Sequence, residues 1–207
     1  MALRRRGWRA RVGQTTALNR HLVAAFWLLT QAAPPAWAEL QESIRTRHYT
    51  ADHRPGTTLL SSLNRHSPIR QDGQVFHAYT AWNIQWNFRW WEERDGRCRV
   101  TSNRTSLQAE LTLPQLNTGD PAVRRRFDLY LLALRAHEME HVKIARDYGR
   151  RIDEGILRLP QMPSCAELTR AANGLGERMM REAAAAEREM DRQTNYGARQ
   201  GATLLGD

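Results

Sequence analysis

The sequence predicts an α+β protein, with strands in the first half of the chain and two long helices after them. Residues 78–91 alternate between apolar and polar side chains, which is typical of a half-buried antiparallel strand. After Pro114 the apolar residues recur every three or four positions, as on one face of an amphipathic helix. Helix-capping signals at Asp120 and Ser164 mark two helix starts.

The strands are expected between Glu39 and Pro114. After the strand at 78–91, the polar run 92–96 contains an Asp-Gly pair that suits a hairpin turn. A second strand follows, with apolar residues at alternate positions: Leu107, Ala109, Leu111 and Leu113. The tryptophans of the first strand could form a stacking surface for nucleic acid, but packing in the core is the favoured interpretation.

The first long helix is expected to begin at Asp120, because an N-cap carboxylate followed by Pro121 is a strong start signal. Its apolar positions continue at helical spacing to residues 156–159. Pro160 follows, so the helix is expected to end there.

The second helix is expected to begin at the capping box Ser164–Glu167 and to run toward Asp191. Gly197 is a candidate terminator. Gly174 and Gly176 predict a weakened or interrupted first half, since glycine is a poor helix former.

The formal net charge of +9 suggests a nucleic-acid partner until its distribution is considered. Residues 1–38 contain six arginines and no acidic residue, so the remainder holds 25 basic and 22 acidic side chains. This near balance argues against a phosphate-binding surface, and no nucleic-acid partner is predicted. The composition, 41% hydrophobic and 26% charged, is that of a globular protein, and residues 39–207 are predicted to form one domain.

Residues 1–38 have the three parts of a secretory signal peptide. A cationic segment ends at Arg20, an apolar segment spans residues 22–29, and Ala36 and Ala38 provide a small-residue cleavage site. The apolar segment is shorter than the roughly 20 residues of a membrane-spanning helix, so no stable membrane insertion is expected after cleavage. Export from a bacterial cell, to the periplasm or the medium, is predicted; an uncleaved anchor or a transit peptide is the alternative.

The two cysteines, Cys98 and Cys165, both lie in the predicted exported part. An even pair in an oxidising compartment predicts a disulfide. The bond would tie the sheet to the last helix, so a stabilising role is expected.

The strongest chemical signal is the H-E-x-x-H motif of His137, Glu138 and His141 within the first long helix. Residues four apart lie one turn apart on one helix face, so both imidazoles can bind a single zinc ion. Glu138 would then serve as the general base toward water. The alternative is a helix with two half-buried histidines and no metal.

A complete zinc site needs a third protein ligand. Asp147 follows His141 by six residues but would point away from it in an unbroken helix. Glu187 and Asp191 on the second helix lie four apart and so share one face. Both remain candidates, beside the ordinary possibility of a solvated, charged face.

These motifs, together with Cys165 near a helix start and the closing stretch of residues 190–201, resemble the predicted secreted zinc-dependent proteases of bacteria. That family is grouped with the zincin peptidases and is otherwise described as a domain of unknown function. The resemblance implies a zincin-like fold, with a sheet ahead of the motif helix. One departure is that Tyr196-Gly197 stands where the family commonly has His-Gly.

The resemblance favours Asp191 as the third ligand. Tyr196 could then replace the family's histidine as a hydrogen-bond donor to an oxyanion, since both side chains can donate a proton. If the family's histidine were itself the ligand, Tyr196 would have to bind zinc as a phenolate, or the site would be impaired.

The function expected is therefore that of an exported zinc metallopeptidase acting on polypeptides, with Glu138 as general base and His137, His141 and Asp191 as zinc ligands. Two alternatives remain. One is a catalytically impaired zincin scaffold that binds an envelope partner. The other is a metal-dependent amidase acting on cell-wall peptide.

Overall fold

Three long strands form the main sheet of the computed structural model, which describes residues 40–71 and 73–204. These strands are β1 (Gln41–Asp52), β4 (Tyr79–Glu92) and β5 (Cys98–Asn117), arranged in the order β1-β5-β4. β4 and β5 form an antiparallel hairpin, and β1 pairs with β5 in parallel. The predicted leader and its cleavage site lie outside the described residues.

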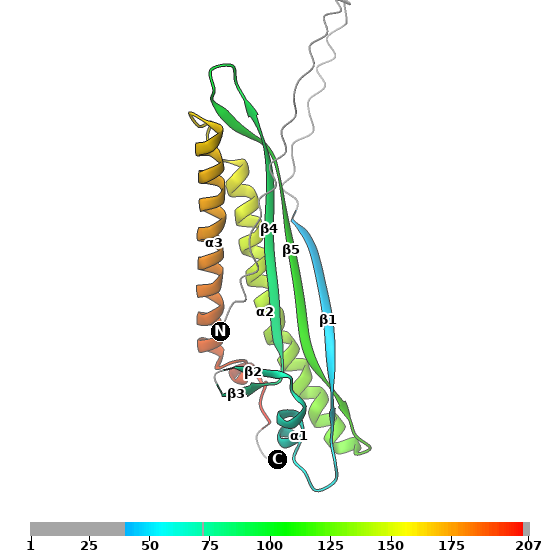
Figure 1. The fold of residues 1–207 in the computed structure, drawn as a ribbon. Coiled ribbons are helices and arrows are strands. Elements are labelled where there is room, and N and C mark those ends of the chain that lie inside the picture. Colours follow the sequence, from blue (N-terminus) through cyan, green and yellow to red (C-terminus); the bar gives the residue numbers. More distant parts are fainter. Residues whose placement is uncertain (1–39, 72, 205–207) are drawn as a thin grey trace, which may run out of the picture.

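Two long helices, α2 (Pro121–Leu157) and α3 (Cys165–Thr194), run along one face of this sheet (Figure 1). α2 packs on β4 and β5, and α3 packs mainly on α2. The predicted α+β class, with a sheet ahead of the helices, is confirmed. None of the helices in the described part of the chain has the length and apolarity needed to cross a membrane.

Short elements gather at one end of the elongated molecule, where β4 begins and α3 ends (Figure 1). They are α1 (Leu59–His66), the hairpin strands β2 (Ile69–Gln71) and β3 (Gln74–Phe76), and the 3₁₀ turn η1 (Ala198–Gln200). The three long strands and two long helices therefore make up most of the molecule, and the short elements cover the end at which β4 begins and α3 ends.

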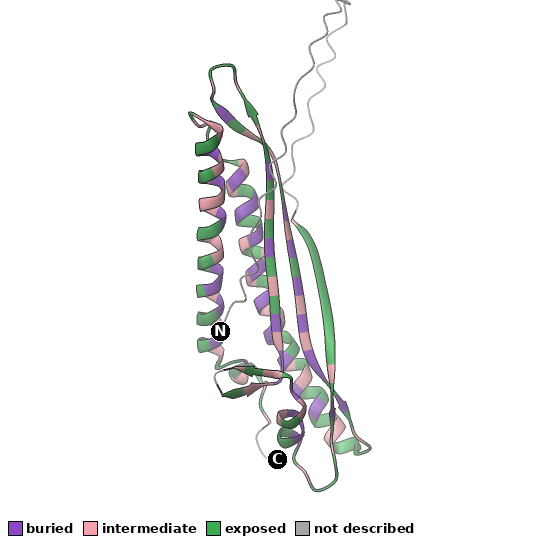
Figure 2. Cartoon of the chain, viewed as in Figure 1, coloured by how far each residue is buried: buried purple, intermediate pink, exposed green. Residues whose placement is uncertain are grey.

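The core lies between the sheet and the helices, and the strand pattern places it there. Along β4, Ile84 and Phe88 are buried while Ala81 and Asn83 are exposed, so the predicted alternation is confirmed (Figure 2). The alternate leucines of β5 are likewise buried. The tryptophans at alternate β4 positions pack against the apolar core, as predicted: Trp82, Trp86 and Trp90.

Both predicted helix starts are confirmed. The Asp120 carboxylate accepts hydrogen bonds from the backbone N–H groups of Ala122 and Val123, at 2.7 and 3.2 Å. Ser164 Oγ accepts one from the backbone N–H of Glu167, at 3.3 Å. These side chains supply acceptors that the first turn of each helix would otherwise lack.

The predicted interruption of the second helix is wrong, because α3 is continuous from Cys165 to Thr194. Its terminator also differs from the prediction. Asn195, with φ of 50°, adopts the left-handed conformation that ends the helix, and Gly197 instead precedes η1. Asparagine tolerates this conformation better than most residues, so it can replace glycine at a helix end.

Gly176 persists within α3 because Trp86 packs directly on it. A methyl group there would lie 2.6 Å from Trp86 Cη2, whereas at Gly174 the nearest side-chain atom would be 3.7 Å away. We therefore expect Gly176→Ala to lower the melting temperature, because overpacking costs about 1–3 kcal/mol against a gain in helix propensity of about 1 kcal/mol. Gly174→Ala, the matched control, should raise it. Thermal unfolding followed by circular dichroism measures both, and equal shifts would contradict the packing argument.

Residues 59–66 form helix α1, although only strands were expected before Pro114. The start signal is Thr58, whose Oγ1 accepts a hydrogen bond from the Ser61 backbone N–H at 3.0 Å. A two-turn helix offers too few periodic positions to stand out in a sequence. β1 is equally inconspicuous, because nearly all of its residues are exposed at the sheet edge.

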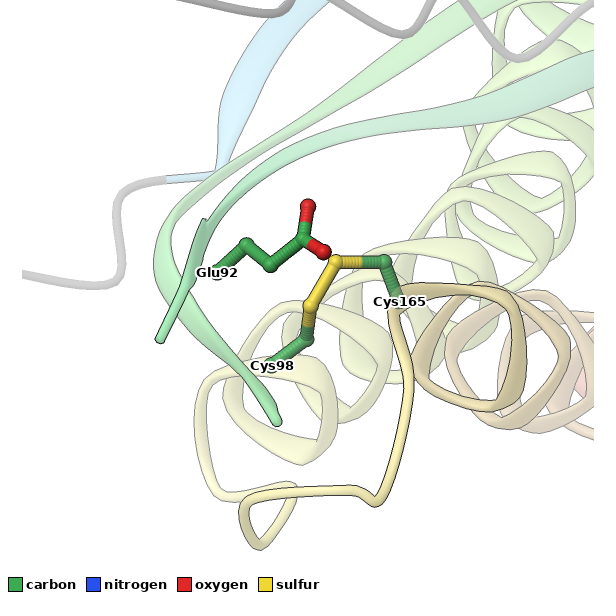
Figure 3. A group of neighbouring side chains, drawn as sticks. All are labelled: Glu92, Cys98 and Cys165. Atoms are coloured by element: carbon green, nitrogen blue, oxygen red, sulfur yellow. A yellow bond between two sulfur atoms is a disulfide. The ribbon is translucent and has the colours of Figure 1, made fainter. Parts of the chain in front are cut away.

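The predicted disulfide is confirmed, since Cys98 and Cys165 are bonded across a Cα–Cα distance of 5.0 Å (Figure 3). The bond joins the start of β5 to the first turn of α3. The two cysteines are 67 positions apart in the sequence, and closing a loop of this length corresponds to about 4 kcal/mol on the loop-closure model. Glu92 lies beside the sulfurs (Figure 3), but bonded sulfurs are not thiolate ligands, so this group is not a metal site.

Candidate metal centre

The two motif histidines lie on the face of α2 that is turned toward α3. His137 and His141 are each 4% exposed, and their ring centroids are 5.1 Å apart. From α3, Asp191 directs Oδ1 between them, 3.3 Å from His137 Nε2 and 3.1 Å from His141 Nε2. The two helices therefore bring together the three residues predicted as ligands, although Asp191 lies 54 residues after His137 and 50 after His141 in the sequence.

The spacing of these three donor atoms suits zinc. They all lie within 4.8 Å of one another. In a tetrahedral site with bonds of about 2.0–2.1 Å, donor atoms lie about 3.4 Å apart, close to the two separations from Asp191. Two imidazole nitrogens and one carboxylate oxygen also form a ligand set typical of catalytic zinc, which leaves a fourth position for water or substrate.

The other ring nitrogen of each histidine is held by a second polar side chain. His141 Nδ1 lies 3.1 Å from Glu187 Oε1, and His137 Nδ1 lies 2.8 Å from Gln200 Oε1. Because both partners are oxygen acceptors, each Nδ1 carries the proton and donates it. Each Nε2, which faces Asp191, is then the ring atom left to bind a metal, an arrangement common among metal-binding histidines.

Glu187, one of the alternative ligands, therefore orients His141 by accepting a hydrogen bond from Nδ1, the ring nitrogen that does not face Asp191. Its Oε1 also accepts a hydrogen bond from Trp82 Nε1, at 2.6 Å, and the side chain is 2% exposed. Asp147, the other acidic candidate, is exposed and lies outside the group, as its position along the helix predicted.

Gln200 was not singled out by the sequence, although it lies within the closing stretch of the resemblance. Gly197, with φ of 84°, makes the turn that precedes η1 and packs against His137; a Cβ there would lie 3.0 Å from His137 Cγ. The chain can therefore pass close to the histidine and place Gln200 beside it. No spacing pattern in the sequence predicts the contact between Gln200 and His137.

The charge distribution of the cluster favours a cation. Burial lowers the pKa of His141, but hydrogen bonds to Asp191 and Glu187 outweigh it and raise the pKa to about 10. Burial raises the pKa of Asp191, but the imidazoles of His137 and His141 bring it down to about 2. Positive charge is thus stabilised between the two helices, where a metal ion would lie.

Glu138 is buried beside this cluster and held in place from the sheet. It is 5% exposed, and Thr80 Oγ1 on β4 donates a hydrogen bond to its Oε2 at 2.7 Å. Burial raises the pKa of Glu138, against the opposing effects of Thr80 and the two motif histidines. A carboxyl group with a raised pKa can both accept and return a proton near neutral pH.

A cavity of about 610 Å³ opens onto the cluster. Its wall contains the predicted ligands, Glu138 and residues from the β2–β3 hairpin. Tyr196 also lines it, 56% exposed, with its ring centroid 5.6 Å from that of Phe76. Each residue predicted to act in catalysis or metal binding thus borders one cavity.

His77 is a further histidine of the cavity wall, and it is bound on both sides. Its Nε2 lies 2.8 Å from Asn64 Oδ1, and its Nδ1 lies 2.7 Å from the hydroxyl of Tyr130. Burial lowers the pKa of His77 to about 4, so the ring is neutral at pH 7. Since both ring nitrogens are engaged, His77 shapes the wall and is not free to bind a metal.

The role of Glu187 can be tested by a pair of substitutions. Glu187→Ala removes the acceptor for His141 Nδ1, and we expect zinc affinity to fall about 10–100-fold. Glu187→Gln keeps an oxygen acceptor and should lose less. Competition with a chromogenic chelator measures the affinity, and Glu177→Ala, at an exposed position of α3, is the control. Unchanged affinity in Glu187→Ala would contradict an orienting role.

Fold and site together define an α+β protein with a candidate metal centre between two helices and an acidic side chain poised beside it. The chain belongs to a family described as "Bacterial protein of unknown function (DUF922)", whose model matches residues 46–197. Neither a curated protein nor a solved structure matches the chain. The family is bacterial, as predicted, and its description assigns no activity.

Proposed function

We propose that this protein is an exported zinc-dependent peptidase with a zincin-like fold. One observation carries the proposal: His137, His141 and Asp191 converge on the wall of a cavity that Glu138 also lines. The ligand set suits zinc, and an acid or base beside it suits hydrolysis. Polypeptides are the proposed substrates, because H-E-x-x-H on a helix is typical of metallopeptidases.

The residues divide the chemistry among them. When held by His137, His141 and Asp191, zinc would supply Lewis-acid chemistry, which polarises a carbonyl and lowers the pKa of water toward about 7. Glu138 accepts a proton from water and later returns it to the leaving amine. Thr80 holds the carboxylate in place. Tyr196, at the cavity wall, donates a hydrogen bond to the oxygen of the scissile carbonyl as negative charge develops there.

The sheet provides a place for the substrate backbone. β4 is an edge strand of the main sheet, and its first residues, Tyr79 and Thr80, line the cavity. An extended peptide can add to such an edge through main-chain hydrogen bonds, which fix its register beside Glu138. Backbone recognition of this kind leaves sequence preference to the side chains of the cavity.

Export is part of the proposal. The Cys98–Cys165 disulfide is typical of an oxidising compartment, and the chain belongs to a bacterial family. Together with the leader-like composition of residues 1–38, this supports release to the periplasm or the medium.

The test is cleavage of a mixed peptide library by the purified protein, with and without a zinc chelator. We expect cleavage that the chelator abolishes and added zinc restores. Zinc binding without cleavage would favour the envelope scaffold instead. Cleavage of isolated cell-wall peptide, but not of the library, would favour the amidase.

A further inference from the structure

The cavity beside the metal centre has an uncompensated positive charge at Arg188. This residue follows Glu187 on α3 and lies one turn before Asp191, so it is on the same side of the helix. It is exposed, and it lines the cavity. Within residues 40–71 and 73–204, no ion pair or hydrogen bond to its guanidinium is found.

The carboxylates nearest to Arg188 along α3 already have other partners. Glu187 accepts hydrogen bonds from Trp82 and His141. Asp191 faces both motif histidines. Glu189 is bound by Arg192 and Gln193. Arg188 is thus left as a cation at a cavity wall.

The total charge of the cavity wall also leaves the positive charge of Arg188 unbalanced. Its described acidic lining residues are Glu138 and Asp191, and a bound divalent cation would offset both. Arg192, the other arginine of the wall, is paired with Glu189 at 2.9 Å. The charge of Arg188 is therefore not balanced from within the described wall, and it is available to a bound molecule.

We propose that Arg188 binds a carboxylate of the substrate, so that the site prefers peptides with an anionic group near the bond to be cut. The guanidinium presents a planar set of donors that matches a carboxylate, which makes arginine well suited to this contact. The carboxylate is either an aspartate or glutamate side chain or the free carboxyl terminus of the peptide. This inference rests on the proposed peptidase function.

A binding measurement tests the proposal without turnover. The probes are acetyl-tetraalanine amide, the same peptide with a free carboxyl terminus, and the amide with glutamate in place of the last alanine. Titration calorimetry follows their binding to the zinc-loaded full chain that carries Glu138→Gln, which prevents cleavage. We expect at least one anionic probe to bind about tenfold more tightly than the neutral one. The two anionic probes separate the two sources of the carboxylate.

The controls assign the preference to Arg188. In the same background, Arg188→Gln should remove the difference between anionic and neutral probes and leave the neutral affinity unchanged. Arg181→Gln removes an exposed charge of α3 that does not line the cavity, and it should keep the preference. Increasing salt should weaken the preference, since the contact is between exposed charges.

Two results would overturn the proposal: equal affinities for all three probes before Arg188 is changed, or a preference that survives Arg188→Gln. The zinc content of each sample is measured separately by elemental analysis. Absence of zinc would defeat the peptidase function. In samples that do contain zinc, the comparison of affinities decides the role of Arg188 by itself, because it needs no catalysis.

Discussion

Glu138→Gln is expected to abolish peptide hydrolysis while the protein keeps its zinc. Glutamine has nearly the same shape, and its amide oxygen can still accept the hydrogen bond from Thr80. It cannot take a proton from water, so we expect kcat to fall by about 10³-fold or more. Cleavage of the peptide library gives the rate, and elemental analysis gives the zinc content.

The matched control for this change is Glu140→Gln. Glu140 lies two residues further along the same motif, is paired with Lys143 at 3.5 Å, and does not line the cavity. Its replacement removes the same charge from the same helix and should leave hydrolysis unchanged. Turnover that persists in Glu138→Gln would rule this residue out as the general base, whatever the zinc content.

His141→Ala is expected to remove the metal altogether. Alanine takes away one nitrogen ligand, leaving Asp191 and His137 as an incomplete site, and it also deprives Glu187 of one of its two partners. Added zinc should raise the melting temperature of the native protein by mass action, whereas in His141→Ala it should cause no shift. Elemental analysis after dialysis should find zinc in the native protein and none in His141→Ala.

His48→Ala controls for the loss of a histidine as such. His48 is exposed on β1, away from the cavity, so this variant should bind zinc as the native protein does. Far-ultraviolet circular dichroism checks that both variants are folded. A folded His141→Ala protein that retains stoichiometric zinc would show that the metal binds elsewhere.

Much of this site was predictable because its signals are local. The caps at Asp120 and Ser164, the alternation along β4 and the one-turn spacing of the two histidines each depend on a few neighbouring residues. Such patterns follow from the geometry of helices and strands, so they depend little on which tertiary contacts the protein forms. They were sufficient to predict the α+β class and the core-facing side of each long element.

What remained undetermined depends on contacts across the fold. Glu187 and Asp191 share one helix face, and the sequence does not tell which of them meets the Nε2 atoms. That choice is made by the packing of α3, which brings Trp82 against Glu187. The approach of Gln200 to His137 likewise depends on the turn at Gly197 after the helix has ended.

Elements without a repeating apolar pattern were also missed. β1 is exposed along most of its length, so it has no buried face to produce an alternation. α1 is only 8 residues long, and its start signal at Thr58 is one of many threonine positions in the chain that could begin a helix. A repeating buried face makes an element recognisable in a sequence: β1 has almost no buried face, and α1 is too short for its buried leucines, Leu59 and Leu63, to form a repeat.

The most direct test of the candidate metal centre is a crystal structure of the protein prepared with one equivalent of zinc. We predict a single ion bound by Nε2 of His137, Nε2 of His141 and a carboxylate oxygen of Asp191, at about 2.0–2.1 Å from each. Glu187 and Gln200 should remain on the Nδ1 atoms, and Glu138 should stay outside the ligand set. A protein without zinc between α2 and α3, or an ion held by other residues, would contradict the account.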